Sequence, residues 1–130
     1  AEAKSIPLVQ EMARQNGDAH YIVARKGRKL YMDNPICVGM KSITTEKDQK
    51  LYVDKEEMDQ MRGKRILIVD DVISTGRSLQ ALEEIAAAAG ADVVGKMAVL
   101  AEGDAASRTD ISYLEKLPLF NAKGEPLPFD

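Results

Sequence analysis

The sequence predicts an α/β fold whose sheet is mostly parallel and flanked by helices, and three observations support this prediction. The apolar run at residues 66–69 contains three β-branched residues and is typical of a strand buried on both faces of a parallel sheet. A helical pattern follows over residues 76–89, and a second apolar run covers residues 92–101. Strand, helix and strand in this order form a βαβ unit, which builds a parallel sheet.

The first predicted element is a helix over residues 6–15. Its apolar side chains recur at helical spacing on one face, and Asn16-Gly17 supplies a stop signal. We expect a strand over residues 20–25 to follow, and then a basic turn over residues 25–29.

An antiparallel hairpin is predicted next, beside the main sheet. Its strands cover residues 36–44 and 49–54 and enclose a polar segment. Residues 56–62 then form a short helical turn that ends at Gly63.

The second half of the chain holds the parallel unit. A strand over residues 65–70 leads into the helix over residues 76–89, with Gly90 at its C′ position. Strands over residues 92–101 and 112–120 complete the sheet, and an irregular tail follows. The inward face of the helix is predicted to carry Leu79, Leu82, Ile85, Ala86 and Ala89.

The composition is that of one globular domain, which we assign to residues 1–130. The hydrophobic share of 45% and the charged share of 30% are ordinary, and a net charge of -3 gives no global reason to expect nucleic acid or an anionic membrane as partner. The single cysteine, Cys37, excludes an intramolecular disulfide, fits a reducing compartment and is expected to be a buried small hydrophobe. No apolar stretch reaches about 18 residues and no signal peptide is visible, so we expect a cytoplasmic protein.

The start of the sequence is unusual for a parallel sheet. Such a sheet usually has a strand that feeds its first helix, whereas the helix over residues 6–15 follows Ala1 almost at once. We therefore expect the domain to be N-terminally incomplete, without its first strand.

Two adjacent carboxylates, Asp70 and Asp71, come directly after the buried strand. Ligands of open α/β sheets collect outside the carboxyl ends of such strands. The turn that follows offers backbone N–H groups at a helix start, which suits a phosphate. Carboxylates beside an anion site indicate a ligand with both hydroxyls and phosphate, such as a sugar phosphate.

Other interpretations of the acidic pair fit less well. Asp70 and Asp71 could cap the helix without a ligand, but two adjacent carboxylates repel each other and need compensation by a metal, donor groups or solvent. Residues 66–71 also resemble the opening strand of phosphoacceptor receiver domains. Too few residues follow the pair for the rest of that fold, and none of the later aspartates ends an apolar run as an acceptor should.

The number and positions of the glycines around Gly76 exclude two nucleotide-binding motifs. A P-loop needs Gly-x-x-x-x-Gly-Lys-Ser/Thr, whereas Asp71 stands five residues before Gly76 and Arg77 follows it. A dinucleotide fingerprint needs three glycines, and only Gly76 is present in this turn.

One resemblance accounts for the whole region. The phosphoribosyl pyrophosphate signature of type I phosphoribosyltransferases closely resembles residues 68–78, Ile-Val-Asp-Asp-Val-Ile-Ser-Thr-Gly-Arg-Ser. In that family the two acids accept hydrogen bonds from the ribose 2′- and 3′-hydroxyls, and the loop wraps the 5′-phosphate. The resemblance implies that Asp70 and Asp71 are catalytic residues that hold the ribose. It implies that the phosphate is held by Ser74, Thr75, Gly76, Arg77 and Ser78.

The rest of the chain resembles the adenine branch of this family. The pyrophosphate loop of that branch is similar to Glu2, Ala3, Lys4 and Ser5, and its basic loop to the segment with Arg25, Lys26 and Lys29. Residues 41–51 take the place of the mobile catalytic loop, in which Glu46 matches a catalytic glutamate. Arg77 and Ser78 depart from the Gly and Thr of many adenine enzymes, and the N-terminal hood over the base is missing.

The resemblance implies transfer of 5-phosphoribose from phosphoribosyl pyrophosphate to a purine, adenine above all, with release of pyrophosphate. It implies Mg²⁺ held mainly by substrate and water, a homodimer, a nucleobase as second substrate, and a role in purine salvage. The alternative is a non-catalytic regulator of the same fold that senses phosphoribosyl pyrophosphate, because such proteins keep the Asp-Asp signature.

Overall fold

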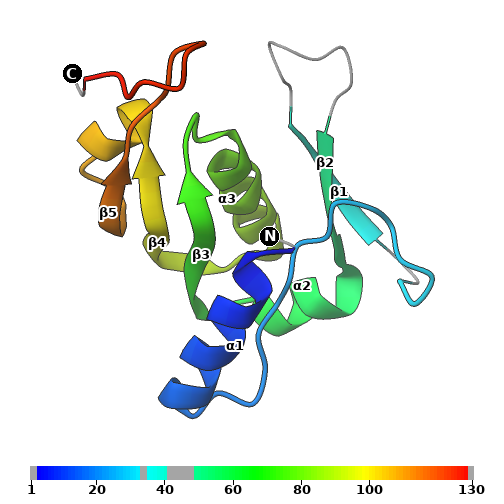
Figure 1. Cartoon of the computed structure of the whole chain (residues 1–130). Coiled ribbons are helices and arrows are strands. Elements are labelled where there is room, and N and C mark those ends of the chain that lie inside the picture. The colour runs from blue at the N-terminus through cyan, green and yellow to red at the C-terminus, as the bar shows by residue number, and fades with distance from the viewer. Residues whose placement is uncertain (1–2, 33–34, 41–48, 129–130) are drawn as a thin grey trace.

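The chain forms two sheets in a computed structural model, which describes residues 3–32, 35–40 and 49–128 (Figure 1). The main sheet is parallel with the strand order β3-β4-β5, and a two-stranded antiparallel hairpin lies beside it. The hairpin strands are β1 (Pro35–Met40) and β2 (Gln49–Asp54), and the parallel strands are β3 (Arg65–Ile73), β4 (Asp92–Glu102) and β5 (Ser112–Leu117). The predicted α/β fold class is therefore confirmed.

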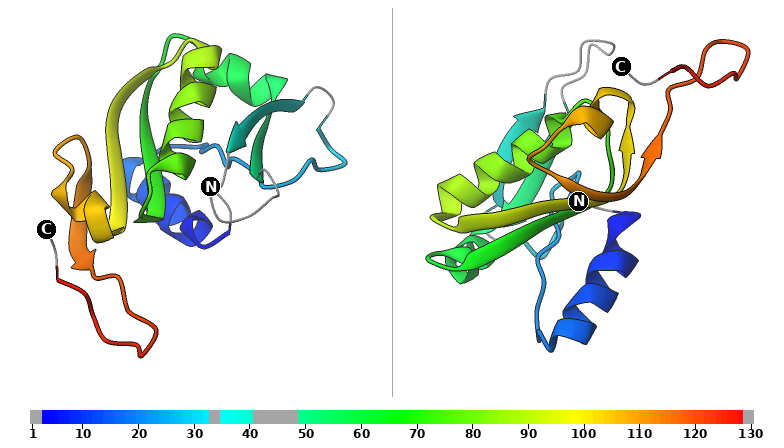
Figure 2. Two further views of the ribbon diagram at one scale, coloured as in Figure 1. Left: turned by 90° about the horizontal axis from the view of Figure 1, so that it is seen from above. Right: turned by 90° about the vertical axis from the view of Figure 1, so that its left-hand side faces the viewer.

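Helices flank the parallel sheet on both faces (Figures 1 and 2). The helix α3 (Arg77–Ala89) lies between the sheet and the hairpin and contacts both, while α1 (Ser5–Asn16) lies against β3 on the opposite face. The short helix α2 (Lys55–Met61) leads from the hairpin to β3, and a 3₁₀ turn, η1 (Gly103–Ser107), follows β4. No helix within the described residues is long and apolar enough to cross a membrane.

A capping box starts α2 directly at the end of β2. The Asp54 carboxylate accepts a hydrogen bond from the Lys55 N–H at 2.9 Å, and the Asp54 N–H donates to Oε1 of Glu57 at 3.3 Å. These bonds satisfy N–H groups that have no partner inside the helix. The sequence can therefore pass from strand to helix without an intervening loop.

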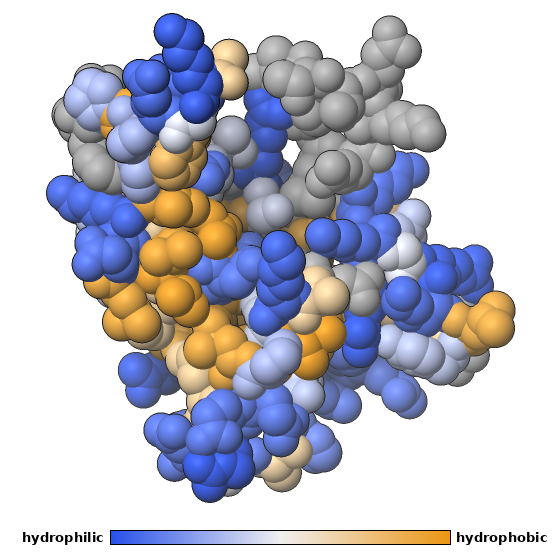
Figure 3. Space-filling model, viewed as in Figure 1, coloured by the Kyte–Doolittle hydropathy of each residue, from blue (hydrophilic) through white to orange (hydrophobic). Residues whose placement is uncertain are grey.

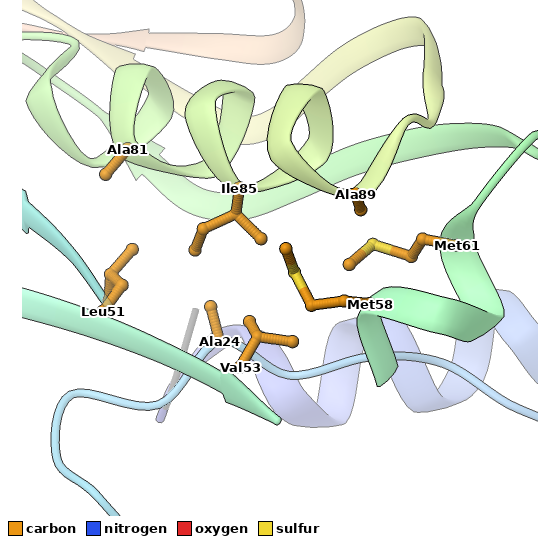
Figure 4. Packing of buried hydrophobic residues seen from close by; sticks show 8 residues of the cluster. All are labelled: Ala24, Leu51, Val53, Met58, Met61, Ala81, Ile85 and Ala89. Carbon is orange, nitrogen blue, oxygen red and sulfur yellow. The ribbon is translucent and has the colours of Figure 1, made fainter. Parts of the chain in front are cut away.

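The larger core cluster holds the hairpin, α2 and α3 together (Figure 4). The sequence places apolar side chains of α3 at helical spacing, so that they form one face. Figure 4 shows this face meeting side chains of β2 and α2. The buried members are Ala24, Leu51, Val53, Met58, Met61, Ala81, Ile85 and Ala89.

A second cluster lies at the carboxyl half of the sheet. It packs the start of α3 against the strands and η1, and thereby holds the end of β3 in place. Its buried members are Ile68, Ile73, Leu79, Ala98, Ala101, Ala105 and Ile111.

The face of the sheet opposite α3 is only partly covered. Figure 3 shows apolar side chains gathered over this face, and Leu67 and Val94 are 43% and 48% exposed. A groove of about 1200 Å³ lies between this face, α1 and the extended segment 19–24.

The predicted strand over residues 20–25 is wrong. Only Arg25 pairs with another strand, through a single antiparallel bridge to Tyr52 of β2. A strand needs a neighbour for its backbone hydrogen bonds. The groove separates segment 19–24 from β3, the nearest edge of the parallel sheet, so no ladder forms between them.

Several predicted boundaries also change. β3 continues three residues past the predicted end at residue 70, and β5 ends at Leu117 instead of residue 120. Cys37 is exposed and not buried as predicted, because its side chain points away from the face on which the neighbouring Ile36 packs against the core. Residues 41–44 of the predicted hairpin strand lie outside the described residues.

Candidate functional site at the carboxyl end of strand β3

The acidic pair lies inside β3 and not after it. Because successive side chains of a strand point to opposite faces, Asp70 and Asp71 diverge. Asp70 shares the face of the buried Ile68 and is only 8% exposed, whereas Asp71 is partly buried on the other face. The two predicted ribose-binding acids therefore start from different faces of the strand, although their carboxyl groups come within hydrogen-bonding reach of each other.

The two carboxyl groups are coupled to each other. Burial raises the pKa of Asp70 to about 6, and the neighbouring Asp71 carboxylate adds to this rise. Burial alone would raise the pKa of Asp71 as well, but hydrogen bonds from the Asp70 side chain and the Val72 N–H, with the Lys4 charge, lower it. The protonated Asp70 carboxyl can thus donate to the Asp71 carboxylate, while Oδ1 of Asp70 accepts from the Asp71 N–H at 2.9 Å.

The loop from Ser74 to Ser78 closes a small pocket at the end of β3. This pocket has a volume of about 100 Å³ and is lined by Asp70 and by residues 72–79. The loop ends in the first turn of α3, where backbone N–H groups without helical partners can bind an anion. The fold therefore brings Asp70 together with the predicted phosphate loop, and Asp71 lies outside the lining of this pocket.

Gly76 allows the loop to turn into α3. Its φ of +85° lies in the left-handed region, which is costly for a residue with a side chain. The next N–H, that of Arg77, donates to Oγ1 of Thr75 over a long 3.4 Å. The turn into α3 thus depends on the conformation of Gly76, and the N–H groups of the first helical turn follow directly after it.

The hydroxyl of Ser74 does not point to an empty site. It donates to Oε1 of Glu102, the last residue of β4, at 2.8 Å. The predicted phosphate ligand Ser74 is therefore already bonded to a carboxylate in this structure.

The predicted pyrophosphate loop lies at the start of α1. Lys4 precedes the helix and is exposed, and its charge helps to lower the pKa of Asp71, so it lies on the Asp71 side of the acidic pair. Ala3 is exposed beside it, whereas Ser5 is buried as the first residue of α1. Glu2 lies outside the described residues, as does Glu46 of the predicted mobile loop.

The basic segment lies elsewhere. Arg25 is joined to β2 through Tyr52, and its charge acts on Glu57 of α2. Figure 1 shows the segment that contains Lys26 and Lys29 beyond the hairpin, on the side away from β3. The pyrophosphate contacts predicted for these three residues stay a prediction.

Sequence reasoning missed two residues beside the Ser74–Ser78 loop, namely Glu102 and Arg108. Glu102 had a usable signal: it directly follows the predicted strand 92–101, and carboxyl ends of neighbouring parallel strands meet at one edge. Arg108 had none, because it lies beyond η1 and reaches Gly76 only through the fold.

The acidic pair supplies the type of oxygen ligand that Mg²⁺ prefers. Mg²⁺ usually takes one or two carboxylates and completes its shell with water and substrate oxygens. Across the described part of the chain, no cluster of three or more His, Cys, Asp or Glu residues gathers around a potential metal position. The two aspartates fit a metal that a phosphorylated ligand would help to hold.

Comparison with known proteins assigns the chain to a family. The family model of the phosphoribosyl transferase domain matches residues 2–122. The chain belongs to this family. The type I phosphoribosyltransferase resemblance of its signature is thereby confirmed.

Two curated relatives within the family act on 6-oxopurines by name. The hypoxanthine/guanine phosphoribosyltransferase of Methanococcus voltae is 33% identical over 108 residues, which cover 83% of this chain and 54% of the relative. The xanthine phosphoribosyltransferase of Geobacillus thermodenitrificans is 35% identical over 75 residues, which cover 57% of this chain and 38% of the relative. The chain thus spans about half the length of the first of these relatives and less of the second.

Solved adenine phosphoribosyltransferases share the fold. The enzyme of Rhodothermus marinus superposes with a TM-score of 0.75 at 21% identity, over 89% of this chain and 66% of the other. The Trypanosoma brucei enzyme, solved with AMP, pyrophosphate and ribose-5-phosphate, gives a TM-score of 0.71 at 17% identity, over 99% of this chain and 59% of the other. At this identity the likeness concerns the fold alone.

Proposed function

We propose that the protein transfers the 5-phosphoribosyl group of phosphoribosyl pyrophosphate to a ring nitrogen of a purine base and releases pyrophosphate. One observation carries this proposal: Asp70 and the Ser74–Ser78 loop line the same pocket at the start of α3. A buried hydroxyl acceptor beside an anion site matches a sugar phosphate. Membership in the phosphoribosyl transferase domain family supports the same substrate.

The residues act by positioning and electrostatics. The bond between C1 of the ribose and the pyrophosphate oxygen breaks, and its electron pair leaves with the pyrophosphate. The ring nitrogen of the base supplies the new pair at C1, and the base gives up a proton. Asp70 and Asp71 hold the ribose hydroxyls so that C1 faces the base, and their negative charge stabilises the cationic character that develops at C1.

Mg²⁺ is part of the proposal. When bound, it neutralises charge on the leaving pyrophosphate. Asp70 or Asp71 would contribute carboxylate oxygens to it, and the substrate and water would contribute the others. Lys4, whose charge acts on Asp71, would add a positive charge near the pyrophosphate.

We propose a purine as the acceptor base, and adenine as the particular purine. A purine is supported by the names of the relatives, which include hypoxanthine/guanine and xanthine enzymes as well as adenine enzymes. Adenine is the base that the resemblance of the loops favours, and the 6-oxopurines are the competing acceptors because the 33% and 35% identical relatives are named for them.

The decisive experiment is a base panel. Purified protein is supplied with phosphoribosyl pyrophosphate, Mg²⁺ and adenine, hypoxanthine, guanine or xanthine in turn, and pyrophosphate release is measured. We expect release with at least one base and none from the Asp70→Asn/Asp71→Asn variant. Release with no base, together with retained binding of the sugar pyrophosphate, would replace the enzyme by the sensor predicted as its alternative.

A homodimer is also proposed, and sedimentation measures it directly. A monomer across the concentration range of the activity assay would contradict it. The measurement is made on the protein with and without phosphoribosyl pyrophosphate, since a ligand that binds only the assembled form shifts the equilibrium.

A further inference from the structure

A hydrogen bond joins the first residue of the Ser74–Ser78 loop to the neighbouring strand. The Ser74 hydroxyl donates to Oε1 of Glu102 at 2.8 Å, in a partly buried position. Ser74 directly follows β3, and Glu102 is the last residue of β4. The bond therefore ties together the carboxyl ends of two parallel strands, at the edge where Asp70 lies.

This bond determines what the Ser74 side chain can offer to a ligand. A hydroxyl has one proton, and here Glu102 receives it, so that the oxygen presents only lone pairs. A phosphate oxygen is an acceptor as well and gains nothing from a second acceptor. Thr75 differs, because its hydroxyl oxygen accepts from the Arg77 N–H and no described residue receives its proton.

The charge of Glu102 also acts on the loop. Attraction for an anion arises there from backbone N–H groups and from the N-terminal end of α3. A carboxylate bonded to the first loop residue repels the same anion. Glu102 therefore holds the loop in shape and weakens its attraction for phosphate at the same time.

We propose, resting on the phosphoribosyl function above, that Glu102 is a positioning residue of the phosphate loop. The Ser74 hydroxyl connects the loop to Glu102 and does not bind the phosphate. The Thr75 hydroxyl donates a hydrogen bond to the phosphate instead. The Glu102 charge limits how tightly the site holds the 5-phosphate. On this proposal the Ser74 hydroxyl has a different role from the phosphate contact that the family signature implies.

The first test needs no ligand. Backbone amide NMR spectra of the free protein are compared for wild type, Ser74→Ala, Glu102→Ala and the double variant. If the Ser74–Glu102 bond holds the loop in shape, both single variants change the chemical shifts of the amides of residues 75–78 in the same way, and the double variant causes no further change. If the two single variants shift different amides, and the double variant shows the sum of both effects, the proposed positioning role of the Ser74–Glu102 bond is overturned. Glu84→Ala, at an exposed position on α3, is the matched control.

The second test is a titration with ribose 5-phosphate. Glu102→Gln keeps an acceptor opposite Ser74 but removes the charge, so we expect affinity to rise about threefold to tenfold at low salt. The gain should disappear near 1 M salt, where charges are screened. Unchanged or weaker binding by this variant would overturn the charge effect, and Glu84→Gln controls for the loss of a negative charge on the protein surface.

Two further variants separate the hydroxyls. Ser74→Ala should change the affinity for ribose 5-phosphate by less than about threefold, and Thr75→Val should lower it about tenfold, the usual effect of losing a hydrogen bond to a charged group. Equal losses would make Ser74 a phosphate ligand and overturn the inference. If wild type binds no ribose 5-phosphate, the proposed function fails, and the NMR comparison still decides whether Glu102 positions the loop.

Discussion

The guanidinium of Arg108 occupies the space that a side chain at Gly76 would need. Nη1 of Arg108 lies 2.6 Å from the position that a Cβ at Gly76 would take. The guanidinium is held there by Asp110, whose carboxylate accepts from Nε at 2.8 Å and from Nη2 at 2.6 Å. The backbone angle at position 76 therefore favours glycine, and a side chain there would also require the flexible Arg108 side chain to shift.

Gly76→Ala should destabilise the fold by about 1–3 kcal/mol, because it combines a strained left-handed backbone with the displacement of the Arg108 guanidinium from its ion pair with Asp110. Gly17→Ala is the matched control, since Gly17 has a φ of +75° and nothing within 4 Å. It should cost only about 1–2 kcal/mol. Chemical denaturation measures both, and an equal cost at the two positions would contradict a role for Arg108. Removing the guanidinium with Arg108→Ala should recover part of the loss at Gly76.

Asp70→Asn should stabilise the fold at neutral pH. The pKa of Asp70 is raised to about 6 in the folded protein, so the folded chain binds a proton more tightly than the unfolded chain between about pH 4 and 6. The free energy of unfolding of the wild type therefore decreases as pH rises through this window. The variant has no carboxyl group at this position, so its free energy of unfolding does not decrease for this reason. We expect the variant to be about 1–3 kcal/mol more stable at pH 7.

Denaturation curves of both proteins, recorded from pH 4 to 7, check this prediction. Asp92→Asn, at the exposed start of β4, is the control, and parallel curves for wild type and Asp70→Asn would contradict the prediction.

The acidic pair should be needed for sugar binding and not for folding. Asp70→Asn combined with Asp71→Asn removes the acceptors for the ribose hydroxyls, so we expect ribose 5-phosphate affinity to fall at least about tenfold. Calorimetric titration measures this loss, and circular dichroism checks that the fold survives. Asp104→Asn, exposed in η1, should leave binding unchanged. Undiminished binding by the double variant would remove both aspartates from the site.

The capping box at α2 should contribute measurably to stability. Asp54→Ala removes the acceptor for the Lys55 N–H and should cost about 1–2 kcal/mol of the free energy of unfolding, whereas Asp54→Ser, which can still cap, should cost less. Asp59→Ala breaks only an exposed ion pair with Arg62, the residue that directly follows α2, and should cost at most about 0.5 kcal/mol. Equal costs at positions 54 and 59 would show that the box adds nothing.

Much of the fold could be predicted because the decisive signals are local. The spacing of Leu79, Leu82, Ile85, Ala86 and Ala89 predicted a helix with this buried face; four of them are buried in α3, and Leu82 is partly buried against both core clusters. The prediction of a strand over residues 20–25 could not be decided from a local pattern. Its residues have strand composition, but a strand also requires a partner with free hydrogen-bonding groups, and only Arg25 has one.

The sequence by itself determined the strand–turn–helix unit from β3 to α3, the acidic pair within it, and membership in the phosphoribosyltransferase family, because these depend on residues close together in the chain. Tertiary structure decided how those residues are used. Pleating sends Asp70 and Asp71 to opposite faces, parallel pairing brings Glu102 to Ser74, and the turn after η1 places Arg108 against Gly76. The last two contacts join residues 28 and 32 positions apart, and the contacts themselves follow from how β3 and β4 pair and how α3 packs on the sheet, although the predicted strand ends already indicated that Glu102 lies at the same edge as Ser74.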